Sequence, residues 1–358
     1  MGAAPERHAS NPERQAGQAF GPNQSNPMGS SESPKIALVR AGQKTPTWGR
    51  SVFNLDSGFK GLMLLAALTV LAVVGLIVVE LLQRSALAWQ KFGFHFFVGT
   101  AWNPVEGNFG ALPFVYGTIV SSLLALIIAV PLAVAVAVFV TEMCPQPLRK
   151  PITFASELLA AIPSVVYGLW AMFILIPILR VHVDPLFAKY LRWTGLFGGP
   201  DYGYSMFAAG VVLAIMIVPI ISSISREVLA VVPQHQREAA LALGATRWEM
   251  IRVAVLKNAR AGIMGAIILG LGRALGETIA VTLVIGNRPE IAKSLLAPGY
   301  SMASVIANEF TEATDDLYLS ALMEIGLALF IVTIIVNILA GVMVWSVTRG
   351  VPAGARGQ

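Results

Sequence analysis

The sequence predicts an all-α membrane protein that crosses the bilayer as six helices. Hydrophobic residues make up 56% of the 358 residues and charged residues only 13%, whereas about 25% of a typical soluble domain is charged. The apolar residues also gather in long runs that reach the roughly 20 residues a helix needs to span a bilayer. Because so much apolar surface needs a non-aqueous environment, the composition excludes an ordinary soluble domain.

Residues 1–59 precede the first complete apolar run and are predicted to form a disordered tail. This segment is rich in Gly, Pro, Ser, Asn and Gln, and it lacks the apolar stretch of a secretory signal peptide. Such a composition buries too little apolar surface to offset the entropy lost on ordering. The tail also carries several Lys and Arg residues, which the positive-inside rule assigns to the cytoplasm.

The membrane domain is predicted over residues 60–350, with its core at 111–347 and a short C-terminal tail at 351–358. Its six apolar runs are Gly61–Leu82, Ala111–Val140, Pro151–Leu179, Tyr204–Ser225, Ala261–Gly286 and Tyr318–Val347. Lys and Arg outside the runs concentrate in the tail and in the loops on its side of the membrane. Six spans return the chain to the side where it began, so both termini are predicted to be cytoplasmic.

The longest predicted cytoplasmic loop, residues 226–260, has the pattern of two short helices joined by a tight turn. Residues 238–243 read Glu-Ala-Ala-Leu-Ala-Leu, a run of strong helix formers. Gly244 follows and allows a backbone turn that a side chain would resist. Thr246 is placed to cap the second helix. This protrusion suits either contact with another protein or a position on the lipid surface.

Two charged residues interrupt the fifth apolar run. Arg273 and Glu277 are four residues apart, so on a continuous helix they share one face. Charges within a membrane span are expensive and persist where they face a bundle interior or a water-filled path. The planar guanidinium fork fits oxyanions, so the pair is a candidate for an anion pathway, or alternatively a buried pair that sets helix register. Gly272 and Gly276 are predicted to let another helix approach closely.

Two further acids, Glu157 in the third run and Glu324 in the sixth, are candidates for a secondary pathway. Both lie nearer the ends of their runs than Arg273 does. The alternative for each is an acid at a helix end or at the membrane interface.

Several classes of site are not expected. Cys144 is the single cysteine, so an intrachain disulfide is excluded, and no His or Cys set has metal-ligand spacing. The chain has no Gly-x-x-x-x-Gly-Lys-Ser/Thr loop for ATP and no Ser/His/Asp pattern for hydrolysis. The net charge of +5 is ordinary for a protein with basic cytoplasmic loops and does not call for nucleic acid. We therefore expect a non-enzyme without catalytic residues, cofactor or metal.

The pattern Glu238-Ala239-Ala240, three residues, then Gly244 resembles the EAA loop of ABC-importer permeases. The family usually continues with Ile-x-Leu-Pro, where this chain has Ala-Val-Leu-Lys at 254–257. The Ile and the Pro are thus missing, while the Glu and the Gly are retained. The resemblance implies that Glu238, Ala239 and Gly244 dock into an ATPase subunit.

The stretch 270–287 resembles the permeases of phosphate (Pst) importers, and Arg-Ala-Leu-Gly-Glu-Thr at 273–278 looks like the PstC type of subunit. Further stretches that resemble this family are 109–118, 157–168, 307–310 and 321–324. The resemblance covers about residues 60–349, which is nearly everything after the tail.

This resemblance implies the type I ABC-importer permease fold, with Arg273 and Glu277 in the translocation pathway for inorganic phosphate. The implied partners are the sister permease PstA in a heterodimer, two copies of the ATPase PstB, the phosphate-binding protein PstS and membrane lipid. ATP hydrolysis would belong to PstB, and the location would be the bacterial inner membrane. Three alternatives were weighed: a permease for another oxyanion such as molybdate or sulfate, a scaffold for phosphate signalling, and a secondary transporter.

Overall fold

The computed structural model describes residues 49–198 and 203–348. The predicted tails lie outside the described residues, the N-terminal one up to residue 48 and the C-terminal one entirely. The chain divides into two units, residues 1–68 and 69–358. The described part of the first unit is the beginning of helix α1 (Gly49–Arg84), whose residues 57–68 are exposed. The first predicted run is therefore confirmed as part of a longer helix.

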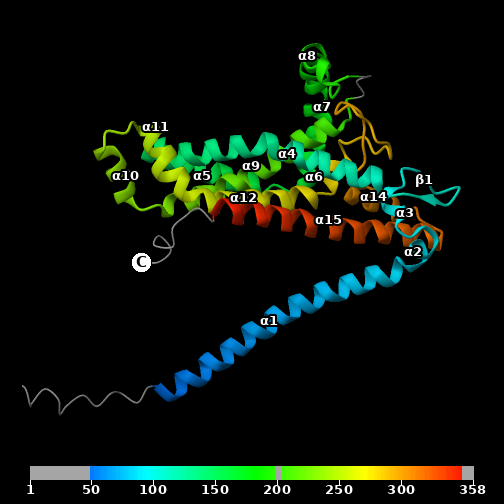
Figure 1. The fold of residues 1–358 in the computed structure, drawn as a ribbon, viewed down its shortest axis with the longest axis horizontal. Helices are drawn as coiled ribbons and strands as arrows, with labels where there is room; N and C mark the ends of the chain where they lie inside the picture. The colour runs from blue at the N-terminus through cyan, green and yellow to red at the C-terminus, as the bar shows by residue number, and fades with distance from the viewer. Residues whose placement is uncertain (1–48, 199–202, 349–358) are drawn as a thin grey trace, which may run out of the picture. The chain divides into compact units, whose positions relative to one another are not determined.

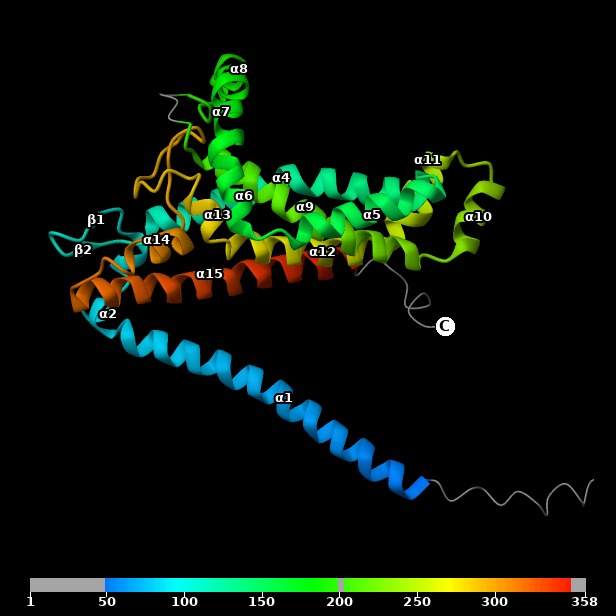
Figure 2. The ribbon, with the colours of Figure 1, turned by 180° about the vertical axis from the view of Figure 1, so that it is seen from behind.

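Four long helices run side by side in the second unit (Figures 1 and 2). They are α4 (Leu112–Val138), α9 (Met206–Val231), α12 (Lys257–Leu275) and α15 (Asp316–Thr348). Helix α9 packs against both α4 and α12 and is buried around much of its circumference, as expected for a helix that is apolar on all sides. It is the central element of this unit.

The third predicted run is divided by Pro163, so its predicted bounds are wrong. The chain forms α5 (Gln146–Ala161) and then α6 (Ser164–Trp170), with Ile162 extended at ψ 129° between them. The proline ring disfavours a helical conformation in the residue before it. After α6 the helix continues through π-turn η2 (Ala171–Leu175), α7 (Ile176–Ile178), π-turn η3 (Leu179–Val183) and α8 (Asp184–Tyr190). The membrane-length helix is thus residues 164–190.

The fifth predicted run also differs from the helix that forms. The helical stretch begins with α11 (Arg247–Met250), continues through π-turn η5 (Ile251–Leu256) and ends with α12 at Leu275. Gly276 follows the helix, and a separate short helix, α13 (Ile279–Thr282), comes after it. The stretch begins early because Thr246 caps it, and it ends early because Gly276 and Glu277 leave the helical path.

Small elements gather at the two ends of the long helices (Figure 1). One end, which we call the α10 end, carries α10 (Gln234–Ala242) and α11. The other, the α14 end, carries α2 (Ala86–Phe92), α3 (His95–Val98), α14 (Met302–Glu309) and a hairpin of β1 (Trp102–Asn103) and β2 (Asn108–Phe109). A short 3-10 helix, η4 (Arg192–Thr194), follows α8. Trp102 is opposite Phe109 in this antiparallel hairpin.

An aromatic cluster holds the hairpin against the helices. The Trp102 ring lies edge-on to Phe109 and Phe114, and the Phe109 ring stacks on Tyr318. Glu309 accepts hydrogen bonds from the Trp102 indole at 2.8 Å and from the Tyr318 hydroxyl at 2.6 Å. Both rings therefore bury their apolar faces while their polar atoms stay bonded.

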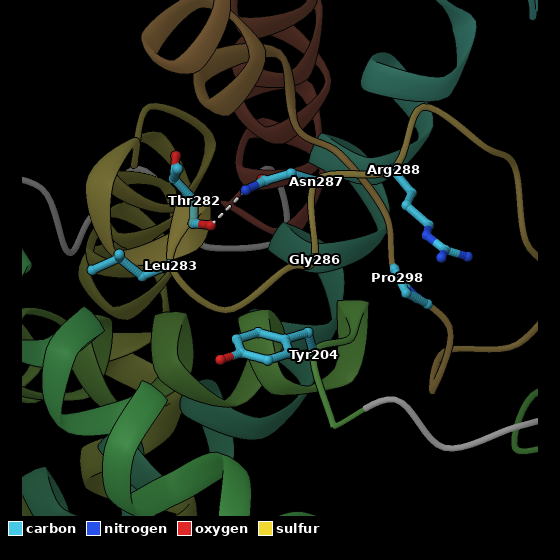
Figure 3. A pocket seen from close by; sticks show the side chains of 7 residues that line it. All are labelled: Tyr204, Thr282, Leu283, Gly286, Asn287, Arg288 and Pro298. Atoms are coloured by element: carbon cyan, nitrogen blue, oxygen red, sulfur yellow. Dashed lines mark hydrogen bonds between the residues drawn. The ribbon is translucent and has the colours of Figure 1, made fainter.

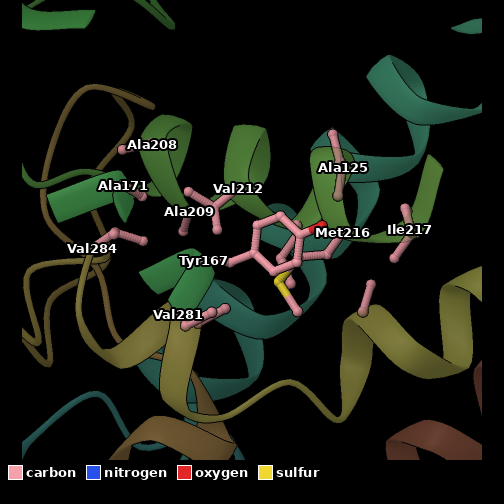
Figure 4. Close-up of a cluster of buried hydrophobic side chains, with 14 of the residues drawn as sticks. Ala125, Tyr167, Ala171, Ala208, Ala209, Val212, Met216, Ile217, Val281 and Val284 are labelled. Atoms are coloured by element: carbon pink, nitrogen blue, oxygen red, sulfur yellow. The ribbon is translucent and has the colours of Figure 1, made fainter. Parts of the chain in front are cut away.

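Six helices among the described residues are long and apolar enough to cross a membrane, which confirms the predicted number. A core between α4, α6, α9, α12 and α13 contains many alanines, with Tyr167 and Met216 filling the space between them (Figure 4). Close helix approach also occurs at Gly270, where a Cβ would lie 2.7 Å from Ile221 of α9. At Gly272 no other described segment lies within 4 Å of a Cβ built there, so the predicted approach of another helix is not made within the described chain.

Candidate functional site

Arg273 and Glu277 form an ion pair at the end of α12. The Nη2 atom of Arg273 lies 3.4 Å from Oε2 of Glu277, and the two side chains are 48% and 3% exposed. Because the helix ends at Leu275, the prediction that both share one helical face is wrong. The turn at Gly276 still brings the two side chains together, and Glu277 Oε1 also accepts a weak hydrogen bond from the Ala280 amide at 3.4 Å.

Helix α12 has one covered face and one open face. The covered face repeats every three or four residues through Ala259, Ile263, Ala266 and Gly270, all buried, and helix α12 packs against α9. On the open face a Cβ built at Gly265 or Gly272 meets no described atom within 4 Å, and Leu269 between them is exposed. Arg273 lies at the edge of this open face, which explains its partial exposure.

Glu157 and Glu324 have quite different environments. Glu157 lies on α5, outside the membrane-length helix, where its exposed carboxylate pairs with Arg226 at 3.3 Å. Its predicted place within a span is wrong because Pro163 separates α5 from that span. Glu324 lies two turns inside α15 and is fully buried, with no hydrogen-bond partner for its carboxylate among the described residues. The alternative of a helix-end acid is therefore wrong for Glu324.

The predicted helix–turn–helix at the α10 end is confirmed. Gly244 has φ +86°, a left-handed conformation that favours glycine. Thr246 forms a capping box with Glu249: its side chain accepts from the Glu249 amide, and the Glu249 carboxylate accepts from the Thr246 amide at 2.8 Å. The predicted loop 226–260 is shorter in the structure, since α9 extends to residue 231 and the next membrane-length helical stretch begins at Arg247.

The loop presents both polar and apolar side chains outward. Glu238 and Ala239 on α10 are exposed, as is Gly244. Three large apolar side chains of this protrusion are also exposed: Leu241, Leu243 and Trp248. An exposed apolar group of this kind is typical of a protein-interaction site.

One ion pair at the α10 end was not predicted. Arg237 of α10 contacts Glu142, which follows α4 in the π-turn η1 (Phe139–Met143), with Nη2 and Oε1 2.8 Å apart. Their separation of 95 residues leaves no local spacing to reveal the pair. The sequence offers only a weak indication of this pair, namely that each residue is charged and lies close to an apolar segment.

The α14 end contains an open pocket of about 410 Å³ that the sequence did not suggest (Figure 3). It is lined by Tyr204, Thr282, Leu283, Gly286, Asn287, Arg288 and Pro298. Asn287 has a positive φ of 51°, and its side-chain amide donates to the Thr282 carbonyl at 3.0 Å. In Figure 3 the Tyr204 hydroxyl and the Arg288 guanidinium point in different directions, so the lining does not converge on one ligand position.

Comparison with known proteins places these features in a family. Residues 129–350 match the family described as "Binding-protein-dependent transport system inner membrane component". The chain is 46% identical over 292 residues to the phosphate transport system permease protein PstC of Mesorhizobium japonicum, covering 80% of this chain and 89% of that protein. It is 43% identical over 305 residues to PstC of Haemophilus influenzae, covering 83% and 96%.

A solved structure shares the fold. It is a bacterial ABC transporter involved in the import of the acidic polysaccharide alginate, with a TM-score of 0.54 and 16% identity, covering 82% of this chain and 99% of that one. At this identity the similarity concerns the fold alone, that of an ABC-importer permease.

Proposed function

Because the chain belongs to the PstC family of phosphate transport permeases, we propose that it forms half of the membrane pathway of an ATP-driven importer of inorganic phosphate. It is a multi-pass membrane protein with six membrane-length helices among its described residues. As a permease subunit it is a transport component, and a separate subunit hydrolyses ATP.

The observation that best supports this proposal is the open face of α12. Gly265, Leu269 and Gly272 leave this face uncovered by the described chain, and Arg273 lies at its edge. A guanidinium turned toward lipid would be costly, whereas one turned toward a partner helix or a water-filled path is not. We infer that the sister permease PstA covers this face and that Arg273 lines the path between the two subunits. Its fork of N–H donors would contact phosphate oxygens.

The α10 end is the proposed site of ATPase coupling. Glu238, Ala239 and Gly244 lie on the exposed protrusion, beside the apolar side chains Leu243 and Trp248. One PstB subunit would bind this protrusion, and a second would bind the equivalent protrusion of PstA. ATP binding would then draw the two protrusions together and change which side of the pathway is open.

This assignment sets the orientation of the chain. The α10 end and both termini would face the cytoplasm of a bacterial cell, and the α14 end would face outward and receive phosphate from PstS. Glu324 remains a candidate for a secondary pathway because it is a buried carboxylate within a span. Glu157 is a weaker candidate, because its carboxylate is exposed and paired with Arg226.

Uptake by the reconstituted complex tests the substrate. Proteoliposomes that contain the chain with PstA, PstB and PstS should accumulate labelled phosphate in an ATP-dependent manner. Labelled sulfate and molybdate, at the same concentration, should not accumulate. Transport of sulfate or molybdate in place of phosphate would assign the chain to another oxyanion, and uptake without ATP would indicate a secondary transporter.

A further inference from the structure

Arg237 joins three elements at the base of the coupling protrusion. From α10 its guanidinium reaches Glu142, with Nη2 at 2.8 Å from Oε1 and Nε at 3.3 Å from both carboxylate oxygens. The same guanidinium donates to two backbone carbonyls, those of Leu229 at 2.9 Å and of Val232. Glu142 follows α4, and the two carbonyls lie at the end of α9. One side chain therefore connects α10 to both α4 and α9.

The surroundings make this connection stiff. The side chains of Arg237 and Glu142 are only 13% and 7% exposed, beside an apolar cluster that includes Val138, Leu229 and Val232. The last carbonyls of a helix lack partners in the regular helical pattern. Arg237 donates to the Val232 carbonyl and adds a second donor to the Leu229 carbonyl, which also accepts from the Val232 amide at 3.3 Å. A bidentate charged hydrogen bond also fixes the orientation of both groups more tightly than a single bond does.

Helices α4 and α9 are the elements that a coupling movement has to reach. Helix α9 is central, packing on α4 and on α12, which carries Arg273. Apart from Arg237, α10 packs against η5 and α11, with Ala240 partly buried, and Gln236 forms an exposed hydrogen bond of 2.6 Å with Asn258. Without the arginine, α10 would lose its side-chain hydrogen bonds to the end of α9, and the backbone at Val232 and Pro233 would join the two helices.

We propose that the Arg237–Glu142 pair is a positioning joint, which transfers movement of α10 to α4 and α9 and so links ATP hydrolysis to opening of the pathway. This inference rests on the proposed docking of the α10 protrusion to the ATPase. The joint does not contact ATP or phosphate. Its loss should therefore leave docking and hydrolysis in place and reduce the phosphate moved per ATP hydrolysed.

The test measures hydrolysis and uptake together in the reconstituted complex. Arg237→Gln and Glu142→Gln should each lower the ratio of uptake to hydrolysis by about 5- to 150-fold, the usual range of coupling between sites. The double variant, with both residues changed to Gln, leaves no unpaired charge and should assemble fully while still showing a lowered ratio. Arg149→Gln is the matched control: this exposed arginine donates at 2.7 Å to the carbonyl of Thr141, within η1, and should leave the ratio unchanged.

Two results would refute the proposal that the Arg237–Glu142 pair transfers movement. One is a normal ratio in the assembled double variant, and the other is an effect of Arg237→Gln that adds to that of Glu142→Gln without interaction in a double-mutant cycle. Gly244→Asp, measured in parallel, separates this from the docking proposal. If Gly244→Asp lowers PstB binding while the pair variants keep a normal ratio of uptake to hydrolysis, the docking proposal is supported and the proposed role of the Arg237–Glu142 pair is refuted. If Gly244→Asp leaves PstB binding normal, the docking proposal itself falls.

Discussion

The Arg273–Glu277 pair offers a sharp test because its two members differ so much in exposure. At 3.4 Å the Coulomb attraction is about 5 kcal/mol at an effective dielectric constant of 20, before desolvation. Arg273 is half exposed, so the net value should fall between the ~1 kcal/mol of a surface pair and the 3–5 kcal/mol of a buried one, at about 2 kcal/mol. Arg273→Gln leaves a buried carboxylate without its partner, whereas Glu277→Gln leaves a guanidinium that reaches water. The first variant should therefore be the less stable by about 1–2 kcal/mol.

The variants at Arg273 and Glu277 should rank differently in transport activity than in stability. Arg273→Gln should abolish phosphate uptake, and Arg273→Lys should retain part of it at most, because Lys keeps the charge but loses the planar fork. Glu277→Gln should keep a measurable fraction, since the arginine remains. The variant with Gln at both positions should recover assembly, because two amides can still hydrogen-bond, but should not recover uptake.

The assay is uptake of labelled phosphate in a strain that lacks other phosphate transporters, with assembly followed by co-purification of PstA and PstB. Thermal unfolding of the purified complex gives the order of stability. Restored uptake in the variant with Gln at both positions would show that the pair only shapes the end of α12. Equal stability of the two single variants would refute the argument from exposure.

Four further predictions address coupling, packing, the subunit interface and topology. Gly244→Asp should lower ATPase binding, because φ +86° costs a non-glycine residue about 1–2 kcal/mol; binding of PstB measures this, and unchanged binding would contradict it. Gly270→Ala should destabilise the isolated chain by about 1–3 kcal/mol, because the new Cβ meets Ile221 at 2.7 Å. Gly272→Ala should leave the chain's own unfolding unchanged but weaken binding of PstA, and a normal heterodimer would contradict the proposed interface. In a cysteine-free background, a cysteine replacing the exposed Val105 should react with a reagent confined to the outside of the cell, and one replacing Ala239 should not; the reverse pattern would overturn the orientation.

Features that depend on composition and on neighbouring residues were predictable from the sequence. The number of membrane helices follows from the length and polarity of the apolar runs. The shape of the α10 protrusion follows from local signals, namely a helix-forming run, the left-handed turn at Gly244 and the cap at Thr246. Such features form within one or two helical turns, so no distant partner is needed to specify them.

Other features depend on which faces the long helices cover, and only the tertiary structure decided these. The sequence pattern favoured Gly272 for close helix approach, but α9 packs on Gly270 and leaves Gly272 open. Glu324, predicted as a candidate for a secondary pathway, is fully buried on α15, which packs against α2, α12 and α14. Arg237 and Glu142 are brought together across 95 residues because α4 and α9 end side by side at the α10 end. Contacts between distant segments leave no periodic pattern in the chain, since packing, and not spacing, selects the partners.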